Sequence, residues 1–412
     1  MAMNSSSILE YISSVLIQSR SPAIYKVMTK KERIGNLTRI TLGKKDVSKL
    51  NKTILLVGET GTGKSTLINA LVNYAMGVKW EDNVWFQIVE DNKTGQAENQ
   101  CESQTSDVNV YEIFGFEGKT LPYSLTIIDT PGYGDTGGID HDDIVSQRLL
   151  ELFGTEGGVH EINAVGLVLK STVNRLDDRQ CYIFNAVLSL FGKNMEDSIV
   201  ALLTHSNGRQ PKNALTALEA AKMKCAKDAK GQPVYFLFEN CQTEDRGEDP
   251  DYLEHVNDIT MKGMRQFAQF LHRSEPKGLK MTVDVLKERM RLMACIRNLK
   301  ERVEFIEKHL EEIQRFDGSM PSLLLFMRMF SGVHMVEPMI EKRKWLEESF
   351  QSVVKLEQIA LNADSLYTHE HLDFLIKTME ETRDAEKIQK LKEMKSRVDG
   401  VIKAGLRYKA AC

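Results

Sequence analysis

The chain has 412 residues, of which 42% are hydrophobic and 27% charged, as in folded globular proteins of two or three domains. Its net charge of −4 gives no basic excess, so we expect no nucleic-acid partner. No run of about 18 apolar residues is present to cross a bilayer, and the start lacks a secretion-signal pattern. The six cysteines form no C-x-x-C pair, which favours a reduced, cytoplasmic compartment, with peripheral membrane attachment left open.

Residues 1–50 are predicted to be an N-terminal extension. Apolar residues recur at helical spacing near its start and predict a helix that packs on its own domain. Docking of that helix on a partner or a membrane surface is the alternative. The apolar positions are Ile8, Leu9, Ile12, Val15 and Leu16.

Residues 58–65 read Gly-Glu-Thr-Gly-Thr-Gly-Lys-Ser and match the G-x-x-x-x-G-K-[ST] phosphate-binding loop (P-loop) without interruption. Because an apolar strand precedes the motif and an amphipathic helix follows it, a plain glycine-rich turn is improbable. Lys64 is expected to reach the β- and γ-phosphates, and the Ser65 hydroxyl to bind Mg²⁺. The backbone that would surround the nucleotide phosphates comprises Gly58, Glu59, Thr60, Gly61, Thr62, Gly63, Lys64, Ser65 and Thr66.

Residues 51–275 alternate between apolar runs and helical periods, which predicts an α/β fold with a mostly parallel, six-stranded sheet. Ligands of such sheets bind at the carboxyl ends of the strands. The predicted strands are Thr53–Val57, Val108–Phe114, Leu125–Asp129, Ala164–Leu169, Ile199–Thr204 and Val234–Phe238. The predicted helices are Ser65–Met76, Asp140–Phe153, Asp177–Phe191, Lys212–Ala229 and Tyr252–Leu271.

The third of these strands ends in Asp129-Thr130-Pro131-Gly132, where Asp129 is placed to hold Mg²⁺ through water. The Gly132 N–H is placed to reach the γ-phosphate, and further glycines follow in a segment expected to respond to that phosphate. A hydroxyl that completes the Mg²⁺ shell should come from the polar segment before residue 107. Thr105 is our choice there, with Ser103 and Ser106 as close rivals.

Two later strand ends are expected to meet the nucleotide base. His205, after Thr204, offers a flat ring to stack on a purine. Glu239, followed by Asn240, can accept hydrogen bonds from the N1–H and N2–H₂ groups of guanine, which adenine cannot supply. A structural role for these side chains would be the usual interpretation without the P-loop.

The P-loop and the motif Asp129-Thr130-Pro131-Gly132-Tyr133-Gly134-Asp135 resemble those of the septin-related GTPases. Thr204-His205 and Glu239-Asn240 are similar instead to the chloroplast import GTPases, relatives of septins and of the immunity-associated GTPases. The resemblance covers roughly residues 50–275 and implies GTP or GDP with Mg²⁺ as cofactors. The guanine motif N/T/A-K-x-D of septins is absent, as it is in the import GTPases.

Hydrolysis needs a positioned water and neutralised charge. Tyr133 stands where many small GTPases have glutamine, so slow intrinsic hydrolysis is expected. In the resembling families two nucleotide faces meet, and Arg175 matches in position the arginine that import GTPases present across that face. The resemblance therefore implies a homodimer or higher oligomer with Arg175 as a catalytic residue beside Lys64 and Thr105. A surface pair of Arg175 with Asp177 or Asp178 is the equal alternative.

Residues 276–412 are predicted to be a helical or coiled-coil domain. Apolar residues step by three and four from Val283 to Ile313, and Asp317-Gly318-Ser319 followed by Pro321 interrupts them. We slightly favour a helical domain that folds back over an extended coiled coil. Two further helical stretches, Leu323–Val333 and Met339–Ala404, are expected, and a methionine-rich patch at residues 320–339 is expected to be core. His369-Glu370-His371 is expected to be surface.

These features together predict a guanine-nucleotide-binding switch with slow hydrolysis, regulated by dimerisation and acting on an unknown protein effector through the helical domain. One alternative is a non-hydrolysing scaffold that holds GTP or GDP within an oligomer. Another is an ATPase, if Glu239 does not face the base. The basic excess of residues 383–409 leaves weak contact with anionic lipid open, although a solvated helix face is preferred.

Overall fold

We describe the protein from a computed structural model. The structure describes residues 9, 12–89, 107–132, 138–173, 177–247, 249–316, 321–398 and 400–411; within these ranges only the backbone is described for 138–143, 313–335 and 410–411. Among the described residues, none of the helices is both long enough and apolar enough to span a bilayer.

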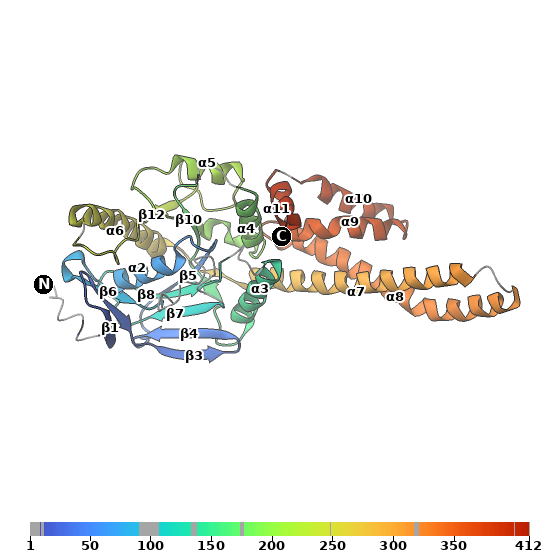
Figure 1. Ribbon diagram of the computed structural model, residues 1–412, viewed down its shortest axis with the longest axis horizontal. Coiled ribbons are helices and arrows are strands. Elements are labelled where there is room, and N and C mark those ends of the chain that lie inside the picture. Colours follow the sequence, from blue (N-terminus) through green and yellow to red (C-terminus); the bar gives the residue numbers. More distant parts are fainter. Residues whose placement is uncertain are drawn as a thin grey trace.

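The central sheet has eight strands in the order β12-β11-β10-β5-β8-β7-β4-β3 (Figure 1). β7 runs antiparallel to β8 and β3 antiparallel to β4, while the other neighbours are parallel. All six predicted strands are present. The eight strands of this sheet are β3 (Lys30–Ile34), β4 (Leu37–Leu42), β5 (Asn51–Gly58), β7 (Asn109–Ile113), β8 (Ser124–Asp129), β10 (Ala164–Lys170), β11 (Ile199–Thr204) and β12 (Tyr235–Leu237).

The sheet is larger than the six strands predicted, because β3 and β4 come from the segment that was predicted as an extension. β4 buries Leu37, Ile40 and Leu42 beside β7, and its apolar pattern is hidden in the sequence among lysines and arginines. β3 covers the outer edge of the sheet with Lys30-Lys31-Glu32-Arg33, charges that oppose pairing with another chain.

The helix expected near the start is wrong over its second half: Val15 and Leu16 lie on a strand, β1. β1 pairs with β2, which pairs with β6, so tertiary pairing overrides the local pattern. The second sheet therefore consists of β1 (Ser14–Gln18), β2 (Ala23–Val27) and β6 (Val84–Gln87). Two short strands, β9 (Glu161–Ile162) and β13 (Lys277–Gly278), form a third sheet.

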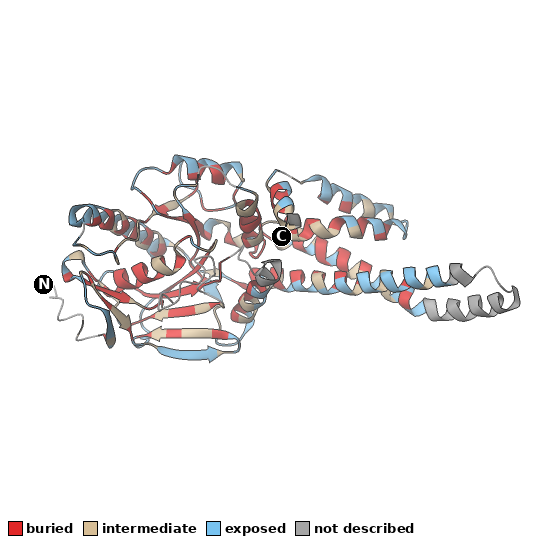
Figure 2. Ribbon diagram, viewed as in Figure 1, coloured by how far each residue is buried: buried red, intermediate tan, exposed pale blue. Residues whose placement is uncertain are grey.

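Helices cover both faces of the central sheet (Figures 1 and 2). Successive residues of β5 alternate between two cores: Ile54 packs with α2 and α6, and Leu55 with α3, α4 and α5. All predicted helices of this region are present, although α5 ends earlier than predicted. The helices are α2 (Lys64–Met76), α3 (Gly138–Gly154), α4 (Asp178–Leu188), α5 (Lys212–Ala220) and α6 (Pro250–Arg273), with 3-10 turns at Trp80–Asp82 and Lys193–Ser198.

The C-terminal region is helical, and its first two helices form a long hairpin that extends away from the sheet (Figure 1). Ion pairs Lys355–Glu288 and Arg302–Glu341 join the two arms, so the folded-back arrangement is the one found. One helix continues through Pro338, where two stretches were predicted. Met339 is exposed, and the other four methionines of the expected patch lie where side chains are not described. The helices are α7 (Lys280–Phe316), α8 (Pro321–Ile359), α9 (Leu366–Glu380), α10 (Ala385–Ser396) and α11 (Gly400–Ala411).

The expectation that His369-Glu370-His371 is surface is wrong. His369 is buried, and the side chain of His371 is 12% exposed. Burial lowers the pKa of His371 to about 4 despite the nearby carboxylate of Glu370. Both histidines therefore lie on α9, which packs against α4, α8, α10 and α11.

α11 returns from the helical region and packs on α4, beside the central sheet (Figure 1). The rings of Tyr182 and Tyr408 lie 5.5 Å apart. A Cβ added at Gly405 would come within 3.2 Å of the Tyr182 Cα, so the glycine allows a close approach of the two helices. The Leu366 N–H, at the start of α9, donates to Asn185 Oδ1 on α4 at 2.8 Å.

Candidate functional site

The P-loop joins β5 directly to α2. Gly61 and Gly63 have φ of 77° and 86°, in the left-handed region that favours glycine. A Cβ at Gly58 would come 2.4 Å from the Val168 carbonyl oxygen on β10. The glycines at these positions are therefore required by the loop conformation and by its close approach to the sheet. Ser65 and Thr66 lie in the first turn of α2, with their side chains half-buried.

The ammonium group of Lys64 lies inside this loop. It is buried, and its Nζ donates to the carbonyl oxygens of Gly58 at 2.9 Å and Glu59 at 3.2 Å. The Thr62 hydroxyl also donates to the Glu59 carbonyl at 2.8 Å. The lysine is thus held as a fixed positive charge at the amino end of α2, where the helix dipole also favours an anion.

The Asp129 motif lies against the P-loop. Asp129 is fully buried at the end of β8, level with Leu56 of β5. The Thr130 hydroxyl donates to the Leu56 carbonyl at 3.0 Å. A Cβ at Gly132 would come 2.1 Å from Thr60 Oγ1 and 2.8 Å from the Thr60 nitrogen. The two predicted phosphate-binding segments therefore touch through a glycine.

This contact gives a direct prediction for Gly132→Ala. The added methyl group must push the two segments apart, so we expect affinity for a non-hydrolysable GTP analogue to fall about tenfold, with a smaller loss for GDP. Titration with both nucleotides measures the difference. Gly154→Ala is the matched control, because a Cβ there meets no atom of the described residues within 4 Å. Equal losses for the two nucleotides would contradict a γ-phosphate role for Gly132.

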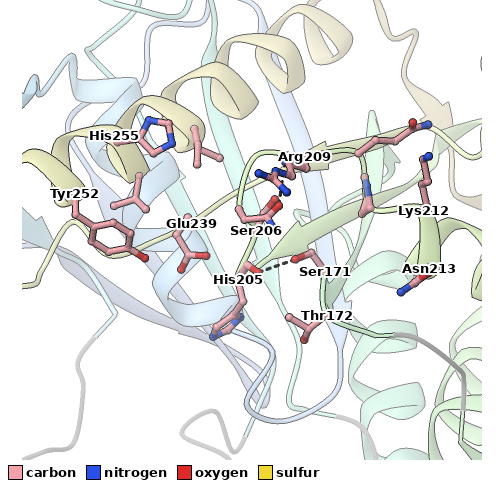
Figure 3. Close-up of a pocket in the computed structure, with 15 residues that line it drawn as sticks. Ser171, Thr172, His205, Ser206, Arg209, Lys212, Asn213, Glu239, Tyr252 and His255 are labelled. Atoms are coloured by element: carbon pink, nitrogen blue, oxygen red, sulfur yellow. Dashed lines mark hydrogen bonds between the residues drawn. The ribbon is translucent and has the colours of Figure 1, made fainter.

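A pocket of about 570 Å³ lies at the ends of β11 and β12, bounded by the start of α6. His205 and Glu239, the two residues expected to meet a base, both line it. In Figure 3 the carboxyl group of Glu239 lies between the rings of Tyr252 and His205. Tyr252 is 55% exposed and was not predicted. Its place in the first turn of a predicted helix is the only sequence signal that pointed to it.

The pocket is joined to the P-loop. The Thr204 hydroxyl donates to the Thr62 carbonyl at 2.7 Å. A Cβ at Gly63 would lie 3.8 Å from Cε1 of the His205 ring. His205 has φ of 52°, a left-handed conformation that is uncommon for histidine, and its carbonyl accepts from the Ser171 hydroxyl at 2.6 Å. The phosphate loop and the pocket therefore form one continuous surface.

Glu239 is held by its neighbours. Its backbone N–H donates to Thr260 Oγ1 at 2.9 Å, and the Cys241 thiol donates to Glu239 Oε1 at 3.2 Å. Burial, reinforced by the nearby carboxylates, raises the pKa of Cys241, so the thiol stays protonated and can donate. Asn240 is not among the residues that line the pocket, and its buried amide oxygen and nitrogen have no hydrogen-bond partner among the described residues.

Two predicted catalytic residues, Thr105 and Arg175, lie outside the described residues. In the described part of the chain, no group of three His, Cys, Asp or Glu side chains is placed to hold a metal ion. A Mg²⁺ ion at the P-loop fits this donor set only with Ser65, Asp129, phosphate oxygens and water, the ligands that this ion prefers. Asp129 is buried at the end of β8, beside the P-loop, and its carboxylate is a ligand type that Mg²⁺ takes.

The family model described as Septin matches residues 48–145, which include the P-loop and the Asp129 motif. This segment is septin-like. Septin-5 of Macaca fascicularis is 30% identical over 118 residues, 27% of each chain. Septin-1 of Drosophila melanogaster is 26% identical over 225 residues, 50% of this chain and 54% of that one. The matches thus span about a quarter to a half of these relatives.

Solved structures of Toc33 from Arabidopsis thaliana are also similar. The complex with GDP and Mg²⁺ has 16% identity and a TM-score of 0.35, covering 56% of this chain and 88% of Toc33. The complex with Mg²⁺ and GMPPNP has 19% identity and a TM-score of 0.34 over the same shares. At this similarity the likeness bears on neither activity nor assembly. Residues 48–145 are therefore septin-like, and they belong to an α/β sheet that is followed by a helical C-terminal region.

Proposed function

We propose that the protein is a guanine-nucleotide-binding switch that binds GTP and GDP with Mg²⁺ and hydrolyses GTP slowly. The observation that carries the proposal is the continuity between the P-loop and the pocket that holds His205 and Glu239. One end offers backbone donors and a buried ammonium group for phosphates. The other offers a ring and a carboxylate for a purine with N–H donors, which favours guanine over adenine.

We further propose that two nucleotide faces dimerise and that Arg175 then acts on the partner's nucleotide. The described residues on both sides of it, Val173 and Asp177, line a cavity together with Glu59 and Thr60 of the P-loop. These two flanking residues therefore lie beside the P-loop, which supports the proposal for Arg175. The helical region would then pass the state of the site to an effector.

Turnover measured across protein concentration tests the proposal. GTP and ATP hydrolysis per chain should be measured after the nucleotide bound to the purified protein has been identified. A rate for GTP that rises with concentration supports a dimer-completed GTPase. Bound GTP or GDP without turnover at any concentration would instead indicate a scaffold that holds nucleotide, and a preference for ATP would contradict the assignment of Glu239.

For Arg175→Ala we expect GTP binding to be kept and the concentration-dependent part of hydrolysis to be lost, at least about tenfold. The reason is that an arginine supplied by a partner neutralises charge that develops in the transition state. Single-turnover rates at low and high protein concentration measure the effect. Arg383→Ala, an exposed change in the helical region, is the control. The same rates for the Arg175 variant and the parent would refute this role.

A further inference from the structure

The first turn of α4 lies between the P-loop and α11. Asp177 caps this helix: its carboxylate accepts from the Gln180 N–H at 2.7 Å, while the Gln180 side chain accepts from the Asp177 N–H at 3.3 Å. Such a reciprocal cap fixes the first turn in place. The next two residues, Asp178 and Arg179, each form an ion pair with a different part of the protein.

Arg179 contacts the P-loop. Its Nε lies 3.1 Å from Oε1 of Glu59, the second residue of the loop, and the two side chains are 38% and 24% exposed. Burial raises the pKa of Glu59, and the guanidinium of Arg179 acts against that rise. A carboxylate beside a phosphate site repels the ligand unless a positive charge compensates it. Arg179 supplies that charge.

Asp178 contacts α11. Its two carboxylate oxygens accept from Nε and Nη2 of Arg407, at 2.9 Å and 2.8 Å. This fork-to-fork geometry is specific in direction, although both side chains are exposed and the pair adds little to stability by itself. Because α11 also packs on α4 through Tyr408 and Gly405, Arg407 attaches the end of that helix to the same turn that holds Arg179.

We propose that the first turn of α4 couples the P-loop to α11, with Arg179 as a positioning residue for Glu59 and Arg407 as the attachment on α11. Docking of α11 holds the turn, the turn keeps Arg179 at Glu59, and the compensated carboxylate allows phosphates to bind. Nucleotide binding must then favour the docked position of α11 by the same factor, because coupling between two sites is reciprocal. This inference rests on the proposed nucleotide function and adds the route by which the helical region senses it.

The coupling is tested by affinities for fluorescent GDP and a non-hydrolysable GTP analogue. Arg179→Gln should weaken binding about twofold to fivefold, the range of a partly exposed ion pair, with the larger loss for the more highly charged triphosphate. Glu59→Gln combined with Arg179→Gln should restore most of the affinity, because the repelling charge is then gone. An unchanged affinity for Arg179→Gln would overturn the proposal.

The α11 side is tested by Arg407→Gln, which leaves the P-loop untouched and should weaken both nucleotides by about twofold. Arg302→Gln is the matched control, since it removes an arginine ion pair within the α7–α8 hairpin. Hydrogen exchange in α11 distinguishes coupling from a purely structural role of Arg179 and Arg407, because a structural role would not make this exchange depend on nucleotide. Residues 400–411 should gain protection when nucleotide is added to the parent and gain less in Arg179→Gln.

The outcomes separate this inference from the proposed function. A parent protein that binds neither nucleotide overturns both. A parent that binds GDP and the GTP analogue, with exchange in α11 unaffected by either, keeps the proposed function and overturns the coupling. Weaker binding in Arg407→Gln together with a reduced exchange response supports it.

Discussion

Lys64→Ala is expected to weaken binding of GDP and GTP at least about 100-fold. The buried Nζ occupies the loop as a positive charge, and two charge-assisted hydrogen bonds to phosphates are each worth about 1.5–3 kcal/mol. The Lys64 Nζ donates to the carbonyl oxygens of Gly58 and Glu59 within the loop, and we expect the fold to persist without it. Isothermal titration with GDP and the GTP analogue, alongside a thermal melt, measures both effects.

Lys230→Ala, an exposed change in a distant turn, is the control for loss of one positive charge. It should bind both nucleotides as the parent does. If Lys64→Ala kept its affinity, the assignment of residues 58–65 as a phosphate-binding loop would fail, and with it the proposed function.

The local conformation of the P-loop and its contact with the Asp129 motif could be predicted because the signals for them are local in the sequence. The P-loop and the Asp129 motif each combine a buried strand with a turn in which glycine is required by the backbone conformation or by a close contact. Gly63 adopts a left-handed conformation, and Gly132 touches Thr60. Apolar runs of four to eight residues also identified the central strands, because buried parallel strands are apolar on both faces.

The contacts that join the P-loop to α4, and α4 to α11, bring together residues far apart in the chain, and no local pattern encodes them. Asp178 and Arg407 are separated by 229 positions, and the Glu59–Arg179 pair depends on how α4 packs beside the P-loop. The helix predicted near the start of the chain is wrong for the same reason, because Val15 and Leu16 form a strand by pairing with β2, which a local pattern does not show. His369 is the converse case, because it is a polar residue that is expected at the surface and that the fold buries.

Glu239→Gln is the second change with a large expected effect, on base selection. A carboxylate accepts from both N1–H and N2–H₂ of guanine, whereas the glutamine amide offers one acceptor and places N–H donors against the other. We expect the preference for GDP over ADP to fall at least about 100-fold, since the site loses one charged hydrogen bond and leaves a donor unpaired. Competition titrations with GDP, ADP and inosine diphosphate measure the change.

Inosine diphosphate isolates one of the two contacts, because it keeps N1–H and lacks the 2-amino group. The parent should bind it about tenfold more weakly than GDP, and Glu239→Gln should barely distinguish the two. Glu219→Gln, an exposed carboxylate on α5, controls for the loss of a negative charge. If the Glu239 variant kept the parent's order of GDP, inosine diphosphate and ADP, the carboxylate drawn between Tyr252 and His205 would not be the group that selects the base.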